Sequence, residues 1–577
     1  MAETTQMVQQ VLARFEQLKQ IRLPHESHWE NISEVLMPRK RGIRSGTAQN
    51  RRQGQKLTDL QYDGTGTRAA ERLASFMHGS MTASTFPWFG LQTRNSDLMD
   101  IKDVADWLEE CAGIMLAAFA MSNWDSEAPE AYLDNIIFGT ASPMFIEEDD
   151  IVTPGQKFGG LRFTAISLGD AWLAENRKRC IDTLYWLTSM SAVSVVGKWG
   201  KKASETTQQA AKLRPYDNVN ILLAVEPRED VKRPTDRSPF AWEMPYAGYY
   251  IEADRRTLLQ ETGFEEFPAP TPRWSRANGE RIYGRGLGDS AYPDVRTLNE
   301  AVRYKLMSLA MALFPPYMKD IGLAGSVRWL PGAEHVVNGK ALGMTPPIQP
   351  IMNGAKFDVA EMEEAKYRDV IKEAFHSGLL QLPEKEMTAS EAQLRIQLMM
   401  RVLGPGVLGR HKSEFLDPTI GRSFGLMLRG GALPPPPDEI LQASPEERSI
   451  DVVYKGPLAM AQRSQDTLAI DSQMDATISV FERTQDPEVL DTIDFDEAMW
   501  HRSEGGSVPS KVMRGKDQVA ERRATRAQAQ QAVQARQERT DMANELLTKA
   551  KAGEAIAKTD PGMGTRTMMV PDAGMGM

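Results

Sequence analysis

The sequence predicts an α+β fold that is mainly helical. Two patterns of apolar residues support this class, and the cysteine count shows how the fold is held together. Apolar residues recur at every third or fourth position through several long stretches, as they do along one face of a helix. Shorter runs rich in aliphatic and aromatic residues lie between residues 144 and 251, bounded by Gly, Pro and Asp, and are typical of strands. Cys111 and Cys180 are the only cysteines, so no disulfide framework holds the fold together.

The N-terminal quarter of the chain is predicted to be helical. Its apolar spacing favours helices over residues 8–21, 29–36, 67–81, 103–121 and 124–138, and Pro38 ends the second of these. Between Arg39 and Lys56 there are seven basic residues and no acidic one, together with three glycines. This segment is therefore expected to be a surface loop or arm.

Extended runs follow, and together they predict a mixed or antiparallel sheet. A helix is expected at 191–199, between two of the runs, and Pro268, Pro270 and Pro272 mark a linker after the last one. The runs cover residues 144–146, 161–166, 182–188, 220–225 and 242–251.

The clearest helix lies between Tyr283 and Phe314. A glycine-rich turn leads to Ser290 as the expected N-cap, and Pro293 is then placed in the first turn, where its missing N–H costs nothing. Pro315 and Pro316 stop the helix. One apolar stripe runs along it, formed by Val295, Leu298, Val302, Leu306, Leu309 and Leu313.

The rest of the chain is again mostly helical. A Gly/Pro-rich segment reaches residue 356, with a strand pair expected near 327–330 and 348–351. The tail at 515–551 contains good helix formers but only a thin apolar face, so it needs neighbouring helices to be stable. Helices are predicted at 359–375, 389–403, 408–428 with a break near Pro418, 462–481 and 493–502, and a short strand at 450–453.

Charge and hydropathy narrow the function. The net charge of −10 argues against a tight nucleic-acid binder, which normally has a basic surface. The longest apolar run, around Leu306–Phe314, is too short to cross a membrane, and the first residues do not have the pattern of a secretory signal. No membrane role is expected.

The sequence has no pattern typical of an enzyme or of a cofactor or metal site. It lacks a P-loop, and Gly284–Asp289 resembles only part of a dinucleotide fingerprint. His25 and His28 could share a helix face, but no cluster of ligands completes a metal site around them. There is no nucleophile elbow, so the chain is predicted not to be an enzyme, to need no cofactor and to bind no metal.

Several motifs, in consistent order from about residue 55 to 465, resemble the head-to-tail connecting, or portal, proteins of short-tailed double-stranded DNA bacteriophages. Each motif alone is weak, but the ordered set is fairly specific. The motifs are Leu57–Gly66, Phe138–Phe145, Tyr283–Gly286, Pro293–Asn299, Met387–Ala392, Arg401–Pro405 and Val453–Arg463.

The resemblance implies a portal fold with wing, stem, clip and crown regions. Residues 1–285 would form the wing, 286–314 the first stem helix, 315–358 the clip and 359–377 the second stem helix. The tunnel loop would be 378–390, and 391–460 would return to the wing. Residues 461–555 would form crown or barrel helices, with a disordered tail at 556–577.

The resemblance also implies a virion protein at one capsid vertex, assembled in the host cytoplasm as a usually dodecameric ring. Double-stranded DNA would pass through the ring without sequence preference during packaging and ejection. The implied partners are a terminase large subunit, major capsid and scaffolding proteins, and a tail adaptor. Within the implied tunnel loop and clip, Lys385, Lys319 and Arg328 are candidate phosphate contacts.

Two other hypotheses remain open. The chain could be a different structural virion protein, such as a tail adaptor or an internal core protein, which would share the helical content without the helix–clip–helix arrangement. A nucleic-acid-processing enzyme would need a metal or nucleotide site, and the sequence contains no pattern for one.

Overall fold

A computed structural model describes the chain in two compact units. The first comprises Met1–Arg94 and Trp107–Ser507, and the second Asn95–Asp106 and Val508–Met577. The described residues are 2–43, 58–99, 101–149, 157–228, 243–279, 282–313, 357–380, 409–442, 444, 450–455, 457–486, 491–505 and 516–559. The predicted strand pair near 327–330 and 348–351 and the predicted helix at 389–403 lie outside them.

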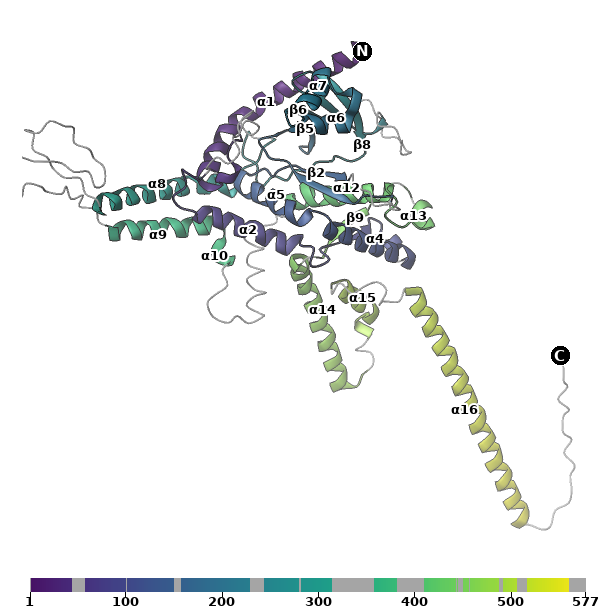
Figure 1. The fold of residues 1–577 in the computed structure, drawn as a ribbon. Coiled ribbons are helices and arrows are strands. Elements are labelled where there is room, and N and C mark those ends of the chain that lie inside the picture. The colour runs from purple at the N-terminus through teal and green to yellow at the C-terminus, as the bar shows by residue number, and fades with distance from the viewer. Residues whose placement is uncertain are drawn as a thin grey trace, which may run out of the picture. The chain divides into compact units, whose positions relative to one another are not determined.

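The N-terminal helices occur where the sequence predicts them, with two differences, of which one is the short helix at Ser96–Met99 that was not predicted. The two helices expected at 8–21 and 29–36 form a single helix, α1, which runs through Pro24 (Figure 1). Near this proline the fully buried Arg22 holds α1 to the loop before β4, because its guanidinium donates to the carbonyls of Leu168 and Ala171, both at 2.6 Å. The helices are α1 (Ala2–Leu36), α2 (Thr65–Met81), α3 (Ser96–Met99), α4 (Lys102–Met121) and α5 (Trp124–Phe138), with a short 3-10 turn at Pro38–Lys40.

All strands pair antiparallel, which confirms the predicted sheet class. The main sheet has the order β4-β5-β6-β7-β8, and β2-β3 and β1-β9 form separate pairs. Six of the nine strands in the described residues match predicted ones, namely β2, β3, β5, β6, β7 and β9, whereas β1, β4 and β8 were not predicted. The strands are β1 (Phe89–Thr93), β2 (Met144–Glu148), β3 (Leu161–Ala165), β4 (Ala171–Glu175), β5 (Ile181–Ser191), β6 (Asn218–Pro227), β7 (Tyr246–Glu252), β8 (Thr257–Phe264) and β9 (Ile450–Tyr454).

Helices cover both faces of the main sheet. On one face, α1 buries Val8, Val11 and Phe15 against a cluster that includes Trp172 and Leu222. On the other face lie α6 (Ala192–Trp199) and α7 (Glu205–Leu213), and the former buries Val195 and Trp199. Ser191 and Ser204 cap the two helices by accepting from backbone N–H groups, as N-cap serines commonly do.

The predicted linker at Pro268, Pro270 and Pro272 is instead a buried segment. The carbonyls of the three prolines accept hydrogen bonds from the backbone of Ile146, Met144 and Ala141, respectively. Proline has no N–H to donate, but its carbonyl still pairs, so alternating prolines can border a strand on one side.

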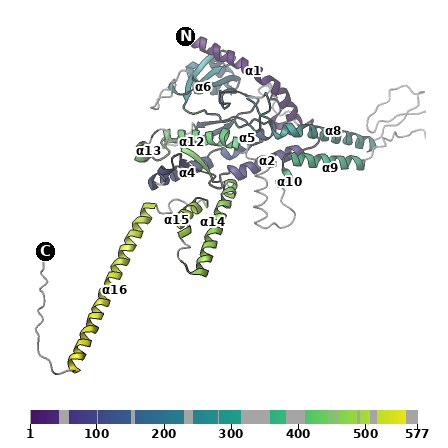
Figure 2. The same ribbon diagram turned by 180° about the vertical axis from the view of Figure 1, so that it is seen from behind.

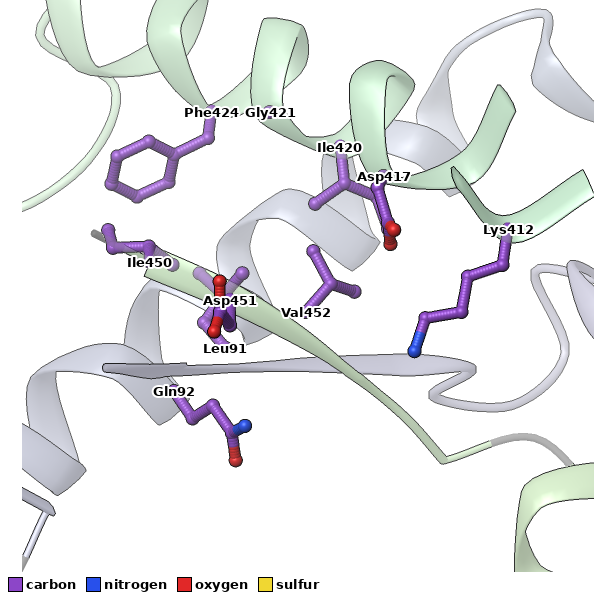
Figure 3. Close-up of a pocket in the computed structure, with 10 residues that line it drawn as sticks. All are labelled: Leu91, Gln92, Lys412, Asp417, Ile420, Gly421, Phe424, Ile450, Asp451 and Val452. Atoms are coloured by element: carbon purple, nitrogen blue, oxygen red, sulfur yellow. The ribbon is translucent and has the colours of Figure 1, made fainter. Parts of the chain in front are cut away.

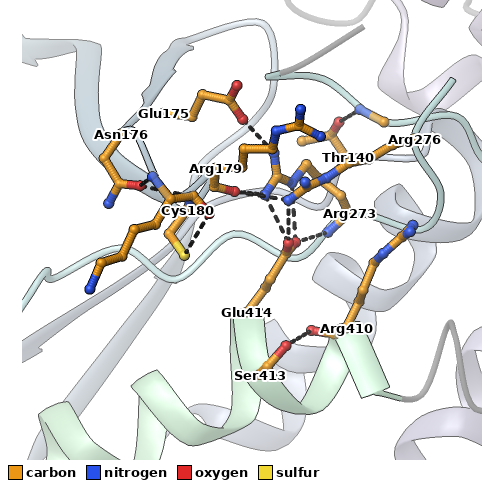
Figure 4. A network of polar contacts seen from close by, with 12 residues as sticks. Thr140, Glu175, Asn176, Arg179, Cys180, Arg273, Arg276, Arg410, Ser413 and Glu414 are labelled. Carbon is orange, nitrogen blue, oxygen red and sulfur yellow. Dashed lines mark hydrogen bonds and ion pairs between the residues drawn. The ribbon is translucent and has the colours of Figure 1, made fainter. Parts of the chain in front are cut away.

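Buried charge connects this segment to the C-terminal half. Arg273, which is fully buried, donates to Glu414 Oε1 at 2.8 Å and to Glu175 Oε2 at 3.2 Å (Figure 4). Its Nη2 also donates to the carbonyl of Arg179 at 2.7 Å. A buried guanidinium needs such partners, and here they join the end of β4 to the π-turn at Lys412–Leu416.

The central helix, α8, spans Leu287–Leu313, so it begins before the expected N-cap. Ser290 lies inside the helix and donates to the carbonyl of Leu287 at 2.9 Å. Pro293 is likewise internal, beyond the first turn. The predicted start is wrong, because Asp289 lies in the first turn of α8 and accepts from the backbone N–H of Gly286, just before the helix, as the third helical residue of a capping box does.

Most of the remaining elements match predicted ones, whereas the short helices at Ser377–Leu380 and Asp438–Gln442 were not predicted. The break expected near Pro418 is a π-turn at Lys412–Leu416 that leads directly into α12. The helix α16 continues through 556–559, which the sequence assigned to a disordered tail, and 560–577 lie outside the described residues. The helices are α9 (Phe357–Ala374), α10 (Ser377–Leu380), α12 (Asp417–Arg429), α13 (Asp438–Gln442), α14 (Pro457–Thr484), α15 (Phe495–Gly505) and α16 (Lys516–Thr559).

Candidate functional site

The feature that stands out is the pair formed by α8 and α9. The two helices run side by side away from the sheet and its covering helices, as both views show (Figures 1 and 2). Lys305 on α8 connects them, because its Nζ lies 3.2 Å from Glu361 Oε1 and 3.3 Å from Glu364 Oε2 on α9. We call these two helices the α8–α9 pair.

A carboxylate fixes the start of α8. Asp289 accepts hydrogen bonds from the His28 ring at 2.6 Å, from Arg285 Nη1 at 2.8 Å and from the backbone N–H of Gly286 at 2.7 Å. Burial alone would raise the pKa of Asp289, but these hydrogen bonds outweigh it and hold the pKa below its usual value. The charged form of Asp289 therefore joins α8 to α1.

The glycine-rich loop before α8 packs backbone against backbone. A Cβ on Gly284 would lie 2.3 Å from the carbonyl oxygen of Gly139, and one on Gly286 would lie 2.5 Å from that of Ile136. A Cβ on Gly288 would lie 2.2 Å from the carbonyl oxygen of Ile137. The sequence predicts only a glycine-rich turn here, and the structure shows why glycine is needed: the backbone closely approaches the end of α5.

Asn299 fastens the middle of α8 to the segment before α2. Its Oδ1 accepts from the backbone N–H of Tyr62 at 2.6 Å and of Asp63 at 3.2 Å. Its Nδ2 donates to the carbonyl of Leu60 at 2.7 Å. One buried amide thus satisfies three backbone groups of a loop, which fixes this loop to α8.

Asp63 extends the connection to α9. It accepts from Arg368 Nε at 3.0 Å and from the backbone N–H of Thr65, the first residue of α2, at 2.8 Å. Although burial raises the pKa of Asp63, the hydrogen bonds from Thr65 and Arg368 lower it overall. Arg368 also contacts Glu364 at 3.2 Å, so one polar network holds α2, α8 and α9.

The outer half of α8 exposes two separate apolar faces. Leu306, Leu309 and Leu313 continue the predicted stripe, and their side chains are 49%, 42% and 67% exposed. Tyr304 and Met307 are 62% and 50% exposed and lie on another side, because each residue turns an α-helix by about 100°. Tyr304 and Leu306 are two residues apart, so their side chains are rotated by about 200° around the helix axis and lie on nearly opposite sides. On α9, Met362 and Val370 are exposed as well.

A pocket of about 530 Å³ lies elsewhere in the first unit, between α12 and the β1–β9 pair (Figure 3). Its walls combine apolar side chains, such as those of Phe424, Ile420 and Val452, with the polar side chains of Gln92, Lys412, Asp417 and Asp451. Asp417 accepts from the Tyr454 hydroxyl at 2.6 Å, and burial raises the pKa of this carboxyl. The residues that line the pocket include neither His nor Cys, Ser or Thr, and its ionisable side chains are Lys412, Asp417 and Asp451.

The structure does not place the three candidate phosphate contacts. Lys385, Lys319 and Arg328 all lie outside the described residues. Sequence reasoning missed Asn299, Asp289 and Glu364, although a polar Asn299 beside the apolar stripe was a visible signal. Across the described ranges, no group of three or more His, Cys, Asp or Glu residues could hold a metal ion, and no helix is long and apolar enough to span a membrane.

Known proteins resemble the chain along most of its length. A family model described as bacteriophage head to tail connecting protein matches residues 8–513. A protein of Bordetella phage BPP-1, named "Probable portal protein", is 30% identical over 555 residues, which is 92% of this chain and 93% of the relative. The "Portal protein" of Salmonella phage epsilon15 is 30% identical over 549 residues, which is 93% of each chain.

Solved structures resemble the chain more distantly. One chain from the neck of an empty gene transfer agent particle is 11% identical and covers 71% of this chain and 86% of its own length, with a TM-score of 0.29. A chain from the virion of a native gene transfer agent particle is 12% identical, covers 64% of this chain and 85% of its own length, and has a TM-score of 0.24. Neither score supports an argument about shape.

Proposed function

This chain belongs to the bacteriophage head to tail connecting proteins and is a portal protein, and we propose that its copies close into a ring at one capsid vertex. The viral genome passes through this ring during packaging and again during ejection. The family match and the two portal proteins among its relatives favour this function over a tail adaptor or an internal core protein.

The observation that supports ring closure best is the presence of two different apolar faces on α8. A two-fold dimer needs one self-complementary patch, whereas a ring needs two unlike patches, so that each copy contacts one neighbour on each side. Leu306, Leu309 and Leu313 form one patch, and Tyr304 and Met307 form the other. In the proposed ring, the first patch of one copy packs against the second patch of the next.

The regions then take the following places in the proposed ring. The α8–α9 pair forms the stem, and residues 1–285 form most of the wing. Residues 315–358, which follow α8 and include the first two residues of α9, form the clip. Residues 378–390 form the tunnel loop and 391–460 return to the wing. The helices after residue 461 form the crown or a barrel, in which copies of α16 supply the neighbours that its thin apolar face lacks.

The charge of the stem suits a conduit that lets DNA slide. The α9 helix carries six acidic and three basic residues, so its net charge is negative. A negatively charged surface does not bind the phosphates of DNA tightly. A few dispersed cations can still guide the duplex without sequence preference. We assign this role to Lys385, Lys319 and Arg328.

The proposed partners follow from this position in the virion. A terminase large subunit docks on the clip and supplies the energy of packaging, since we assign no catalysis to this chain. Major capsid and scaffolding proteins surround the ring, and a tail adaptor binds it after packaging. We propose a dodecamer that assembles in the host cytoplasm.

Deletion of residues 315–358 tests the division between stem and clip. The deleted chain is expected to form rings, seen by negative-stain electron microscopy, but to lose binding of the terminase large subunit and the tail adaptor. If the deleted chain binds both partners as the full chain does, the clip assignment is wrong. If it is folded but no longer forms rings, the stem does not carry the ring contacts.

A further inference from the structure

The layer formed by α6 and α7 has an outer face without a partner among the described residues. The inner sides of these helices pack on the main sheet, where Val195 and Trp199 are buried with Ile221 and Leu259. The opposite side carries Val193, Leu213 and Tyr216, whose side chains are 45%, 81% and 84% exposed. We call residues 192–216 the α6–α7 corner.

The corner is strongly basic within an acidic chain. It contains five basic residues and one acidic residue, Glu205, whereas the whole chain has a net charge of −10. Lys201, Lys202 and Lys212 are exposed and form no ion pair with any residue that the structure describes. Arg214 Nε lies 3.1 Å from Asp217 Oδ2, and the Arg214 side chain is still 76% exposed, so it remains accessible to a partner. The free cations favour an acidic partner.

The exposed apolar side chains identify the partner as a protein. A leucine gains nothing from a phosphate backbone, whereas Tyr and Leu beside each other can fill a socket on a protein surface. Their turn is already ordered, since Asp217 N–H donates to the Arg214 carbonyl at 3.0 Å and Val193 N–H donates to the Pro215 carbonyl at 3.0 Å. An ordered turn loses little entropy on binding.

We propose that the α6–α7 corner docks another protein of the virion, through Leu213 and Tyr216 in an apolar socket and through its lysines against acidic side chains around that socket. This inference rests on the proposed function, because it takes the partner from the proteins that assemble with the ring. The corner is separate from the α8–α9 pair, so docking and ring formation are distinct properties of the chain.

Two full-length variants test this proposal. The anchor variant combines Leu213→Ser with Tyr216→Ser, and the charge variant combines Lys201→Glu, Lys202→Glu and Lys212→Glu. Their controls are Met121→Ser, at a side chain that is 88% exposed, and the triple change Lys157→Glu, Lys178→Glu and Arg255→Glu, which alters net charge equally. Circular dichroism verifies that every variant is folded.

Each variant replaces the wild-type chain in cells that make all other virion proteins. Both corner variants are expected to form closed rings when purified, but to yield at least tenfold fewer infectious particles, with rings missing from assembled heads or tails missing from filled ones. The controls are expected to match the wild type.

Three results would overturn the proposal. Infectious yields equal to the wild type would mean that the corner docks nothing. Loss of rings from both corner variants would make the corner a contact between copies of this chain. Loss of binding to a 30-base-pair duplex by the charge variant alone, with the anchor variant fully infectious, would make it a nucleic-acid surface. Absence of rings from the wild-type chain would instead contradict the proposed function, independently of the corner.

Discussion

The side-chain oxygen of Asn299, halfway along α8, accepts a hydrogen bond from the backbone N–H of Tyr62 at 2.6 Å, although the two residues are 237 positions apart in the sequence. The same amide binds the backbone of Leu60 and Asp63. Asp63 in turn binds Arg368 of α9. The α8–α9 pair is thus held at its inner half by polar contacts and is left apolar and exposed at its outer half.

Replacing Asn299 by alanine tests how much this contact stabilises the first unit. The change removes the partner of the Tyr62 N–H and of the Leu60 carbonyl, two part-buried hydrogen bonds that contribute about 0.5–1.5 kcal/mol each. We expect the free energy of unfolding to fall by about 1–3 kcal/mol in chemical denaturation. Arg296→Ala, at an exposed position on the same helix, is the control. Equal stability of the two variants would show that the amide is dispensable.

Gly286→Ala tests the close packing before α8. The added Cβ would lie 2.5 Å from the Ile136 carbonyl oxygen, so the backbone must move, and overpacking of this kind costs about 1–3 kcal/mol. Gly113 provides the matched control, because it lies within α4 and a Cβ there meets nothing within 4 Å. Gly113→Ala is expected to stabilise the helix by about 0.5–1 kcal/mol. A Gly286→Ala variant as stable as the wild type would contradict the packing described for this loop.

His411 predicts a loss of stability in acid. Its ring stacks on Tyr132 at 4.6 Å, and neither ring nitrogen has a hydrogen-bond partner among the described residues. Burial lowers the pKa of His411 to about 3, against about 6.5 when unfolded. Between these values the unfolded state binds one more proton than the folded state, so stability falls as the pH drops from about 6.5 towards 3.

His411→Phe removes this titration while it keeps an aromatic ring in the stack. Its free energy of unfolding, measured from pH 7 to pH 4, is expected to depend less steeply on pH than that of the wild type. His501→Phe, at a side chain that is 59% exposed, is the control for the loss of a histidine. Parallel curves for His411→Phe and the wild type would mean that His411 does not titrate in this range.

Periodicity predicted the elements but not what joins them. The stripe from Val295 to Leu313 was visible because helical spacing repeats along one face. The start of α8 was misplaced because Ser290 is a good N-cap by residue type, whereas Asp289 acts from inside the first turn and accepts from the backbone N–H of Gly286 before the helix. Pro268, Pro270 and Pro272 resembled a linker because their pairing with residues 141–146 depends on a distant strand.

The candidate site was foreseen only in part. The resemblance to known portals located the helix pair, and the pair is described in the structure over Leu287–Leu313 and Phe357–Ala374. The roles of Asn299, Asp63 and Glu364 could not be predicted, because each side chain acts on a segment far away in sequence. The second apolar face also went unnoticed, since Tyr304 and Met307 interrupt a charged surface instead of forming a long stripe.

Electron microscopy of purified protein, with and without charges on the first apolar patch, tests the central claim most directly. The wild-type chain is expected to form closed rings. The Leu306→Glu, Leu309→Glu variant is expected to remain a folded monomer, because ring closure would bury these charges between neighbouring copies of α8. Met121→Glu, at an exposed apolar residue outside α8, should form rings normally. Wild-type protein that gives only monomers or open filaments at every salt concentration would contradict the account, as would a double variant that closes into rings like the wild type.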